Sequence, residues 1–211
     1  PDFTLAYFPN NDFESHERGP QQALDVLQNI DAHLGKLFDV FGGVDNLLQE
    51  VAVLITGDHS QSDVRGDQEQ GIRLDKNLEG FSVVDAGDNW QSDDDVMVCP
   101  NMRTALLYLQ SAAWERRSEI IARLLDDERI DQVIWDDEGF DPHRCFHVAT
   151  SDRGELKFWS APEGTGVVDS FGNTWQFAGN PAALDARIEG ERLLYGDYPN
   201  ALERIAGGCY R

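Results

Sequence analysis

Two apolar runs that enclose one long helical pattern constrain the fold of this chain more than any other feature. Residues 3–8 and 51–56 are apolar or β-prone, which is typical of buried strands. Between them, residues 20–41 repeat large apolar side chains at spacings of three and four, which predicts one amphipathic helix that ends at Gly42. A strand, a helix and a strand in this order favour a parallel pair with a right-handed crossover.

An aspartate and a histidine follow each apolar run. Asp12 and His16 come after the turn-forming residues 9–11, and Asp58 and His59 follow the second run. Ligands of open α/β sheets bind at the carboxyl ends of the strands, so we expect both pairs to face one crevice. Carboxylate oxygens and imidazole nitrogens suit zinc and similar divalent ions. The alternative is structural: Asp12 caps a turn, His16 lies on the surface, and the second pair belongs to an ordinary loop.

The rest of the chain has a different character. Residues 60–71 are polar and rich in glycine and aspartate, which predicts a loop, and shorter mixed elements follow. Turn residues at 151–154 and 170–173 predict two hairpins. We therefore expect an α+β module after a β-α-β piece. The expected strands are 81–85, 96–99, 104–109, 132–135, 145–150, 156–160, 167–169 and 174–177, and the expected helices are 115–125, 181–189 and 200–205.

Composition excludes several classes of partner. The chain carries 39 acidic against 17 basic residues, a net charge of −22, which repels phosphate backbones and argues against a nucleic-acid duplex as ligand. It has no apolar run of about 18 residues, so no membrane partner is expected. Its three cysteines show no C-x-x-C spacing, which favours reduced thiols and leans towards the cytoplasm. The start at Pro1, without an initiator methionine, suggests a fragment.

The motifs resemble a known family. Residues 1–20, PDFTLAYFPNNDFESHERGP, resemble the metal-binding strand and loop of the nucleotide pyrophosphatase/phosphodiesterases of the alkaline phosphatase superfamily. Residues 55–60, ITGDHS, are similar to the S-D-H-G motif of that family, with Gly57 and Ser60 as departures. The resemblance is close over residues 1–64 and loose afterwards. It implies an α/β fold, with a partial alkaline-phosphatase-like parallel sheet (βαβ) in residues 1–64 and an α+β cap domain in residues 65–211.

The resemblance also implies a chemistry. Asp12 and His16 would ligate one divalent metal ion, and Asp58 and His59 would ligate a second, with zinc expected at both sites. Such an enzyme hydrolyses the phosphodiester or pyrophosphate bond of a small phosphodiester or nucleotide substrate.

The family nucleophile, a threonine or serine, has no match in this sequence and is expected upstream of Pro1. A further histidine ligand is expected beyond Arg211. The remainder of its own polypeptide is therefore an expected partner, and the chain alone is expected to be inactive.

Three alternatives stay open at this point. The protein could belong to a phosphomonoesterase, sulfatase or phosphomutase branch of the same superfamily, or it could be a non-catalytic acidic module that retains the fold. His143 and His147 could also share one face of a strand. The sequence places no acidic partner beside them, so we interpret them as ordinary residues of the cap.

Overall fold

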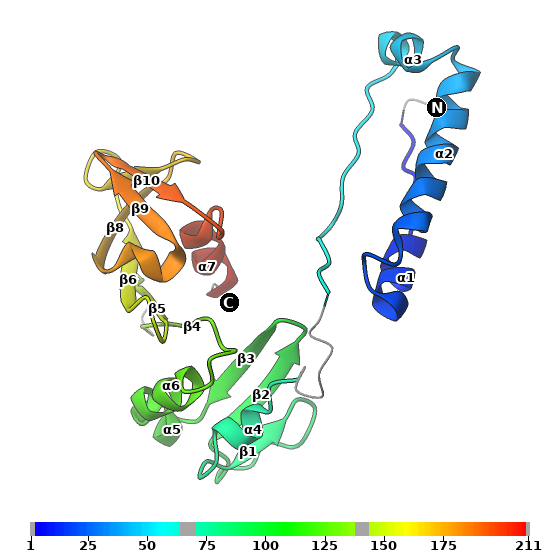
Figure 1. The fold of residues 1–211 in the computed structure, drawn as a ribbon. Coiled ribbons are helices and arrows are strands. Elements are labelled where there is room, and N and C mark those ends of the chain that lie inside the picture. The colour runs from blue at the N-terminus through cyan, green and yellow to red at the C-terminus, as the bar shows by residue number, and fades with distance from the viewer. Residues whose placement is uncertain (1–2, 64–70, 138–143, 210–211) are drawn as a thin grey trace. The chain divides into compact units, whose positions relative to one another are not determined.

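The computed structural model describes residues 3–63, 71–137 and 144–209. The chain divides into two compact units, Pro1–Gly71 and Ile72–Arg211, which we call unit 1 and unit 2. Figure 1 shows the elements of both units, and each unit is described by itself below. The predicted boundary between residues 64 and 65 lies outside the described residues and stays a prediction.

The described part of unit 1 is built from helices. Its helices are α1 (Asn10–Arg18), α2 (Leu24–Val40) and α3 (Val44–Glu50). Helix α2 confirms the predicted helix, and the chain leaves it through Gly42 and Gly43, whose φ angles of 76° and 117° suit glycine. Helix α1 was not predicted, because residues 9–11 indicated a turn. Pro9 instead precedes the helix, and its carbonyl accepts hydrogen bonds from the first turn.

The two predicted strands of unit 1 are wrong in this structure. Residues 3–8 and 51–56 lie in no strand, and they carry some of the most exposed apolar side chains, such as Leu54 at 94% exposure. A strand is stable only when neighbouring strands satisfy its backbone donors and acceptors. Among the described residues, neither segment has such a neighbour, so the predicted parallel βαβ pair of an alkaline-phosphatase-like sheet is not formed here.

Unit 1 also has a small core. The described residues buried in it are Ser15, Ala23 and Leu47. None of these lies in α2, whose apolar stripe was expected to face a sheet. The stripe therefore predicted the helix correctly but not its burial.

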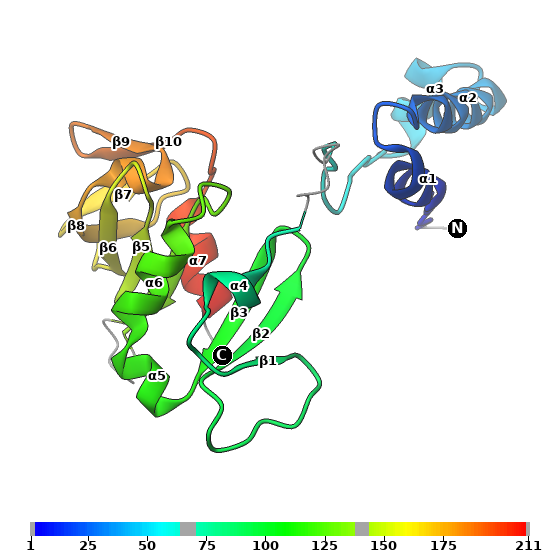
Figure 2. The ribbon, with the colours of Figure 1, turned by 60° about the horizontal axis from the view of Figure 1, so that its bottom comes forward.

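The first part of unit 2 is a small sheet covered by helices. The strands β1 (Val83–Asp85), β2 (Val96–Asn101) and β3 (Thr104–Leu109) lie in the order β1-β2-β3, with β1 and β2 parallel and β2 and β3 antiparallel. The helices are α4 (Leu74–Asn77), α5 (Ser111–Glu115) and α6 (Arg117–Leu125). Ile120 and Leu124 of α6 pack with Val96 and Val98 of β2 in one core cluster, and Figure 2 shows this group of elements.

The second part of unit 2 is a seven-stranded sheet. Its strands are β4 (Val133–Asp136), β5 (Phe146–Ala149), β6 (Glu155–Ser160), β7 (Val167–Asp169), β8 (Thr174–Gly179), β9 (Ala186–Glu189) and β10 (Arg192–Tyr195). They lie in the order β4-β5-β6-β8-β7-β10-β9. The β5–β6 and β7–β8 pairs are antiparallel, which confirms both predicted hairpins. The β7–β10 pair is parallel.

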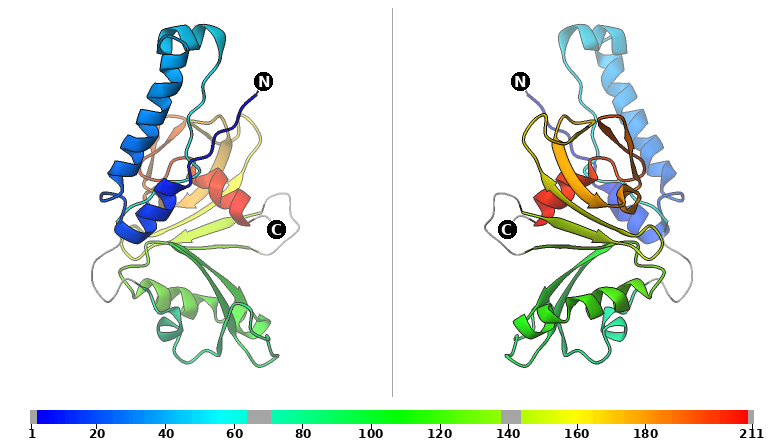
Figure 3. Two further views of the ribbon diagram at one scale, coloured as in Figure 1. Left: turned by 90° about the vertical axis from the view of Figure 1, so that its right-hand side faces the viewer. Right: turned by 90° about the vertical axis from the view of Figure 1, so that its left-hand side faces the viewer.

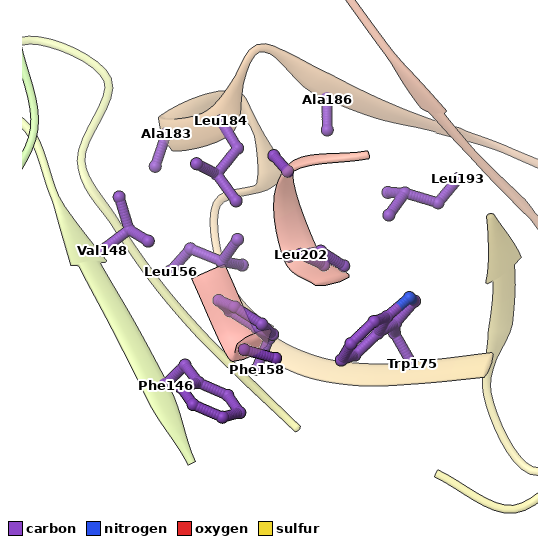
Figure 4. Close-up of a cluster of buried hydrophobic side chains, with 12 residues drawn as sticks. Phe146, Val148, Leu156, Phe158, Trp175, Ala183, Leu184, Ala186, Leu193 and Leu202 are labelled. Carbon is purple, nitrogen blue, oxygen red and sulfur yellow. The ribbon is translucent and has the colours of Figure 1, made fainter. Parts of the chain in front are cut away.

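Helix α7 (Ala201–Cys209) packs against one face of the larger sheet. Leu202 of α7 is buried with Phe158 of β6 and Trp175 of β8, and the rings of these two aromatic residues meet edge to face at 5.7 Å. Figure 4 shows this cluster. Burial of large aromatic and aliphatic side chains is the main source of stability in such a core. The other buried members are Phe146, Val148, Leu156, Ala183, Leu184, Ala186, Leu193, Ala201 and Ala206.

One element of unit 2 corrects the prediction. Residues 181–189 were expected to form a helix, but only the 3-10 turn η1 (Pro181–Leu184) is helical there. The chain then continues as β9, which pairs with the unpredicted strand β10. This pairing joins two strands around Gly190, which has a φ of 64°. The whole chain is thus a mixed α/β protein with parallel and antiparallel strand pairs.

The extended segment 51–63 is the expected site of first cleavage in limited proteolysis. It contains no helix or strand, and nearly all of its residues are exposed. Proteases cut exposed chain that can adapt to their clefts. Mass spectrometry of the early fragments should therefore locate cuts between residues 51 and 71. First cuts within the β5–β6 or β7–β8 hairpins would contradict the division into two units.

Candidate metal centre

Helix α1 brings Asp12 and His16 together. Residues four apart lie one above the other on a helix face, and the His16 Nε2 atom lies 3.5 Å from Asp12 Oδ1. Both side chains are about half exposed, so an ion could reach them from solvent. This pair was predicted from sequence, although the prediction placed it after a strand and not within a helix.

Asp58 and His59 form the second pair in the extended segment. The His59 backbone N–H donates to Asp58 Oδ1 at 2.9 Å, and the His59 Nε2 atom lies 3.7 Å from Asp58 Oδ2. The Asp58 side chain is 86% exposed. The hydrogen bond to the backbone holds one carboxylate oxygen and turns the other towards the imidazole.

The donor spacing of each pair fits a shared ion. Two donor atoms that each lie about 2.1 Å from a tetrahedral zinc ion are about 3.4 Å apart. The observed separations of 3.5 Å and 3.7 Å are close to this value. Each pair can therefore supply one carboxylate oxygen and one imidazole nitrogen to the same divalent cation.

The two pairs do not merge into one cluster in this structure. In the part of the chain that the structure describes, no group of three or more His, Cys, Asp or Glu side chains is placed to share an ion. The two segments contact each other through Gln61, whose Nε2 donates to Asp12 Oδ1 at 2.6 Å, and Asp63 also approaches Gly19 after α1. Figure 3 shows the chain as it returns from α3 towards α1. The assignment of the four residues as metal ligands stays a prediction.

Sequence reasoning missed the partners of His147. This residue lies in β5, where its ring stacks on Trp135 at 4.9 Å and its Nε2 atom lies 3.1 Å from Asp137 Oδ2. Lys157 contacts the same oxygen at 3.0 Å. Burial raises the pKa of Asp137, but the contacts with His147 and Lys157 outweigh it and hold this pKa below its usual range. His143, the other member of the sequence pair, lies outside the described residues.

This cluster is an ion-pair network on the sheet. Cross-strand pairing places Trp135, His147 and Lys157 in one row, which brings the side chains together. The ammonium of Lys157 lies against Asp137 Oδ2, so it competes with a metal ion for that oxygen. The interpretation of His147 as a residue of the strand therefore agrees with its surroundings.

Unit 2 contains two cavities. The larger, of about 280 Å³, lies between α7 and the sheet, and the smaller, of about 220 Å³, lies beside His147. Neither is lined by any of the four predicted ligands. The larger is lined by Arg144, Phe146, Ser160, Trp175, Glu203, Ala206 and Gly207, and the smaller by Trp135, His147, Val148, Glu155, Leu156, Lys157, Ala178 and Gly179.

Each pair joins a carboxylate to an imidazole, two kinds of side chain that ligate divalent cations in proteins. The chain belongs to the type I phosphodiesterase/nucleotide pyrophosphatase family, whose model matches residues 1–155. The match covers unit 1 and the part of unit 2 up to the start of β6, and so extends beyond the region where the motifs are recognisable by eye. This is a family of metal-dependent hydrolases.

Comparison with curated proteins and with solved structures finds no match for the chain. Among its described residues, no helix combines the length and the apolar character needed to cross a bilayer.

Proposed function

We propose that this protein is a zinc-dependent hydrolase of small phosphodiesters or nucleotide pyrophosphates, with Asp12 and His16 at one ion and Asp58 and His59 at the other. The observation that carries the proposal is the family match over residues 1–155, a segment in which these two pairs bring their donor atoms to 3.5 Å and 3.7 Å. Two such ions, when bound, stabilise the charge on the attacking and leaving oxygens of a phosphoryl transfer.

The residues of the chain have separate tasks in this proposal. The carboxylates supply negative charge that holds the cations, and the imidazoles supply neutral nitrogen donors that bind without adding charge. The net charge of −22 disfavours long phosphate backbones, because each added phosphate meets the same repulsive field. The substrate class that fits best is therefore a small molecule with one phosphodiester or pyrophosphate bond.

Hydrolysis of chromogenic esters by the full-length protein tests the proposal. We expect turnover of bis-p-nitrophenyl phosphate to exceed that of p-nitrophenyl phosphate, to stop after chelation and to return when Zn²⁺ is added. Preference for the monoester or for p-nitrophenyl sulfate would instead assign the protein to another branch of the superfamily. Absence of metal-dependent turnover on all three esters would favour a non-catalytic module.

A further inference from the structure

Gln61 joins the two segments that carry the predicted ligands through a side-chain hydrogen bond. Its amide Nε2 donates to Asp12 Oδ1 at 2.6 Å, across 49 positions of sequence. Both residues are half-buried, whereas Asp58 and His59 are exposed. The bond is therefore less exposed than the Asp58–His59 pair.

The same two segments make a second close approach at Gly19. Gly19, which follows α1, has a φ of 84°, and a Cβ added there would lie 2.9 Å from Asp63 Oδ1. A side chain at position 19 would push this carboxylate away, besides being strained at this φ. Residues 61–63 thus approach the helix at two separate points, Asp12 in its first turn and Gly19 just after its end.

The chemistry of an amide donor suits a carboxylate that must also bind a cation. A carboxylate has about four lone-pair positions, and Gln61 occupies one of them on Oδ1. A lysine or arginine in place of Gln61 would neutralise the carboxylate and repel a cation, but the neutral amide orients it and leaves its charge unchanged.

We infer that Gln61 is a positioning residue for the metal centre, which acts through Asp12. Its hydrogen bond holds the Asp12 carboxylate in one orientation, and it ties the segment that carries Asp58 and His59 to the helix that carries His16. Partners that orient a ligand in this way set metal affinity because they reduce the freedom lost on binding. The inference rests on the proposed function, since it presupposes that Asp12 is a ligand.

Calorimetric titration of Zn²⁺ into the chelator-treated, full-length protein tests the inference. Gln61→Ala and the similarly long Gln61→Met both remove the donor, and we expect each to weaken zinc binding about 10- to 100-fold. Gln49→Ala, at an exposed position of α3, is the matched control and should bind zinc as the wild type does. Without metal, Gln61→Ala and Gln61→Met should unfold at the same temperature as Gln49→Ala. Weaker zinc binding at an unchanged unfolding temperature would separate a loss of positioning from a general loss of fold.

A double-mutant cycle decides whether Gln61 acts through Asp12. In an Asp12→Asn background, Gln61→Ala should have no further effect on zinc affinity. An equal effect in both backgrounds would overturn the inference, as would zinc binding of wild-type strength in Gln61→Met. If the wild-type protein binds no zinc, both the proposed function and this inference fail. If the wild type and the variants bind zinc equally well, the inference fails but the proposed function does not.

Discussion

Replacement of Asp169 with alanine is expected to destabilise unit 2 by about 3 kcal/mol or more, which is a large part of the stability of a domain. The Asp169 side chain is buried, at 5% exposure, and it accepts five hydrogen bonds. Oδ1 accepts from the backbone N–H groups of Phe171 and Asn173, and Oδ2 accepts from Trp175 Nε1, the Tyr195 hydroxyl and the Asn173 side chain. Alanine would remove the acceptor of the buried Trp175 indole and of the partly buried Tyr195 hydroxyl.

Chemical denaturation followed by tryptophan fluorescence measures this loss. Asp169→Asn should also destabilise the protein, because the new N–H₂ group faces other donors. Its loss should be smaller than that of Asp169→Ala, because the amide oxygen still accepts hydrogen bonds. Asp197→Asn, at an exposed carboxylate near β10, is the control and should change the unfolding free energy by less than about 0.5 kcal/mol. If Asp169→Ala proved as mild as this control, Asp169 would not be a structural centre of the sheet.

The stability contributed by Asp169 should also depend on pH. Burial raises the pKa of this carboxyl, but the hydrogen bonds from Trp175, Asn173 and Phe171 outweigh it and hold the pKa below its usual range. A group whose pKa is depressed by folding stabilises the protein above its unfolded pKa of about 3.9, and this stabilisation is lost as the pH falls through the folded value. The difference between wild type and Asp169→Asn should therefore shrink in acid.

The second large effect is expected at the proposed metal centre. Asp58→Asn in the full-length protein should lower the zinc-dependent kcat/KM for bis-p-nitrophenyl phosphate by more than about 100-fold, because loss of a ligand should exceed the loss of an outer partner. The substitution removes a charge and a metal donor but keeps the size of the side chain. Its amide oxygen can still accept the hydrogen bond from the His59 backbone. Stability should change little, since the side chain is mostly exposed.

A control carboxylate distinguishes a ligand from general electrostatics. Asp45→Asn removes the same charge from the exposed first turn of α3 and should leave the zinc-dependent rate unchanged. Equal rate losses in both variants would indicate that total negative charge, and not ligation by Asp58, supports activity. Full activity of Asp58→Asn would remove this residue from the proposed centre.

Local sequence patterns determined several elements of this protein. The apolar period of three and four with Gly42 after it predicts α2, because helix geometry and glycine termination depend on residues close in sequence. The turn residues around 151–154 and 170–173 predict the β5–β6 and β7–β8 hairpins for the same reason. The types and spacing of two Asp/His pairs likewise predict metal ligands without knowledge of the fold. The pairs are Asp12 with His16 and Asp58 with His59.

Only the tertiary structure decided which partners these segments have. Apolar runs such as 51–56 favour a strand, but a strand also needs a neighbour, and the described residues provide none. Residues 186–189 became β9 because β10 pairs with them, and the local sequence contains no sign of this choice.

The long-range hydrogen bonds to Asp169 and Asp12 also depend on the tertiary structure. Tyr195 reaches Asp169 from another strand, and Gln61 reaches Asp12 across 49 residues. Such contacts depend on how distant segments meet when their apolar surfaces are buried. The sequence by itself therefore determined which polar and metal-ligating side chains the protein carries. The tertiary structure decided which of these side chains contact one another.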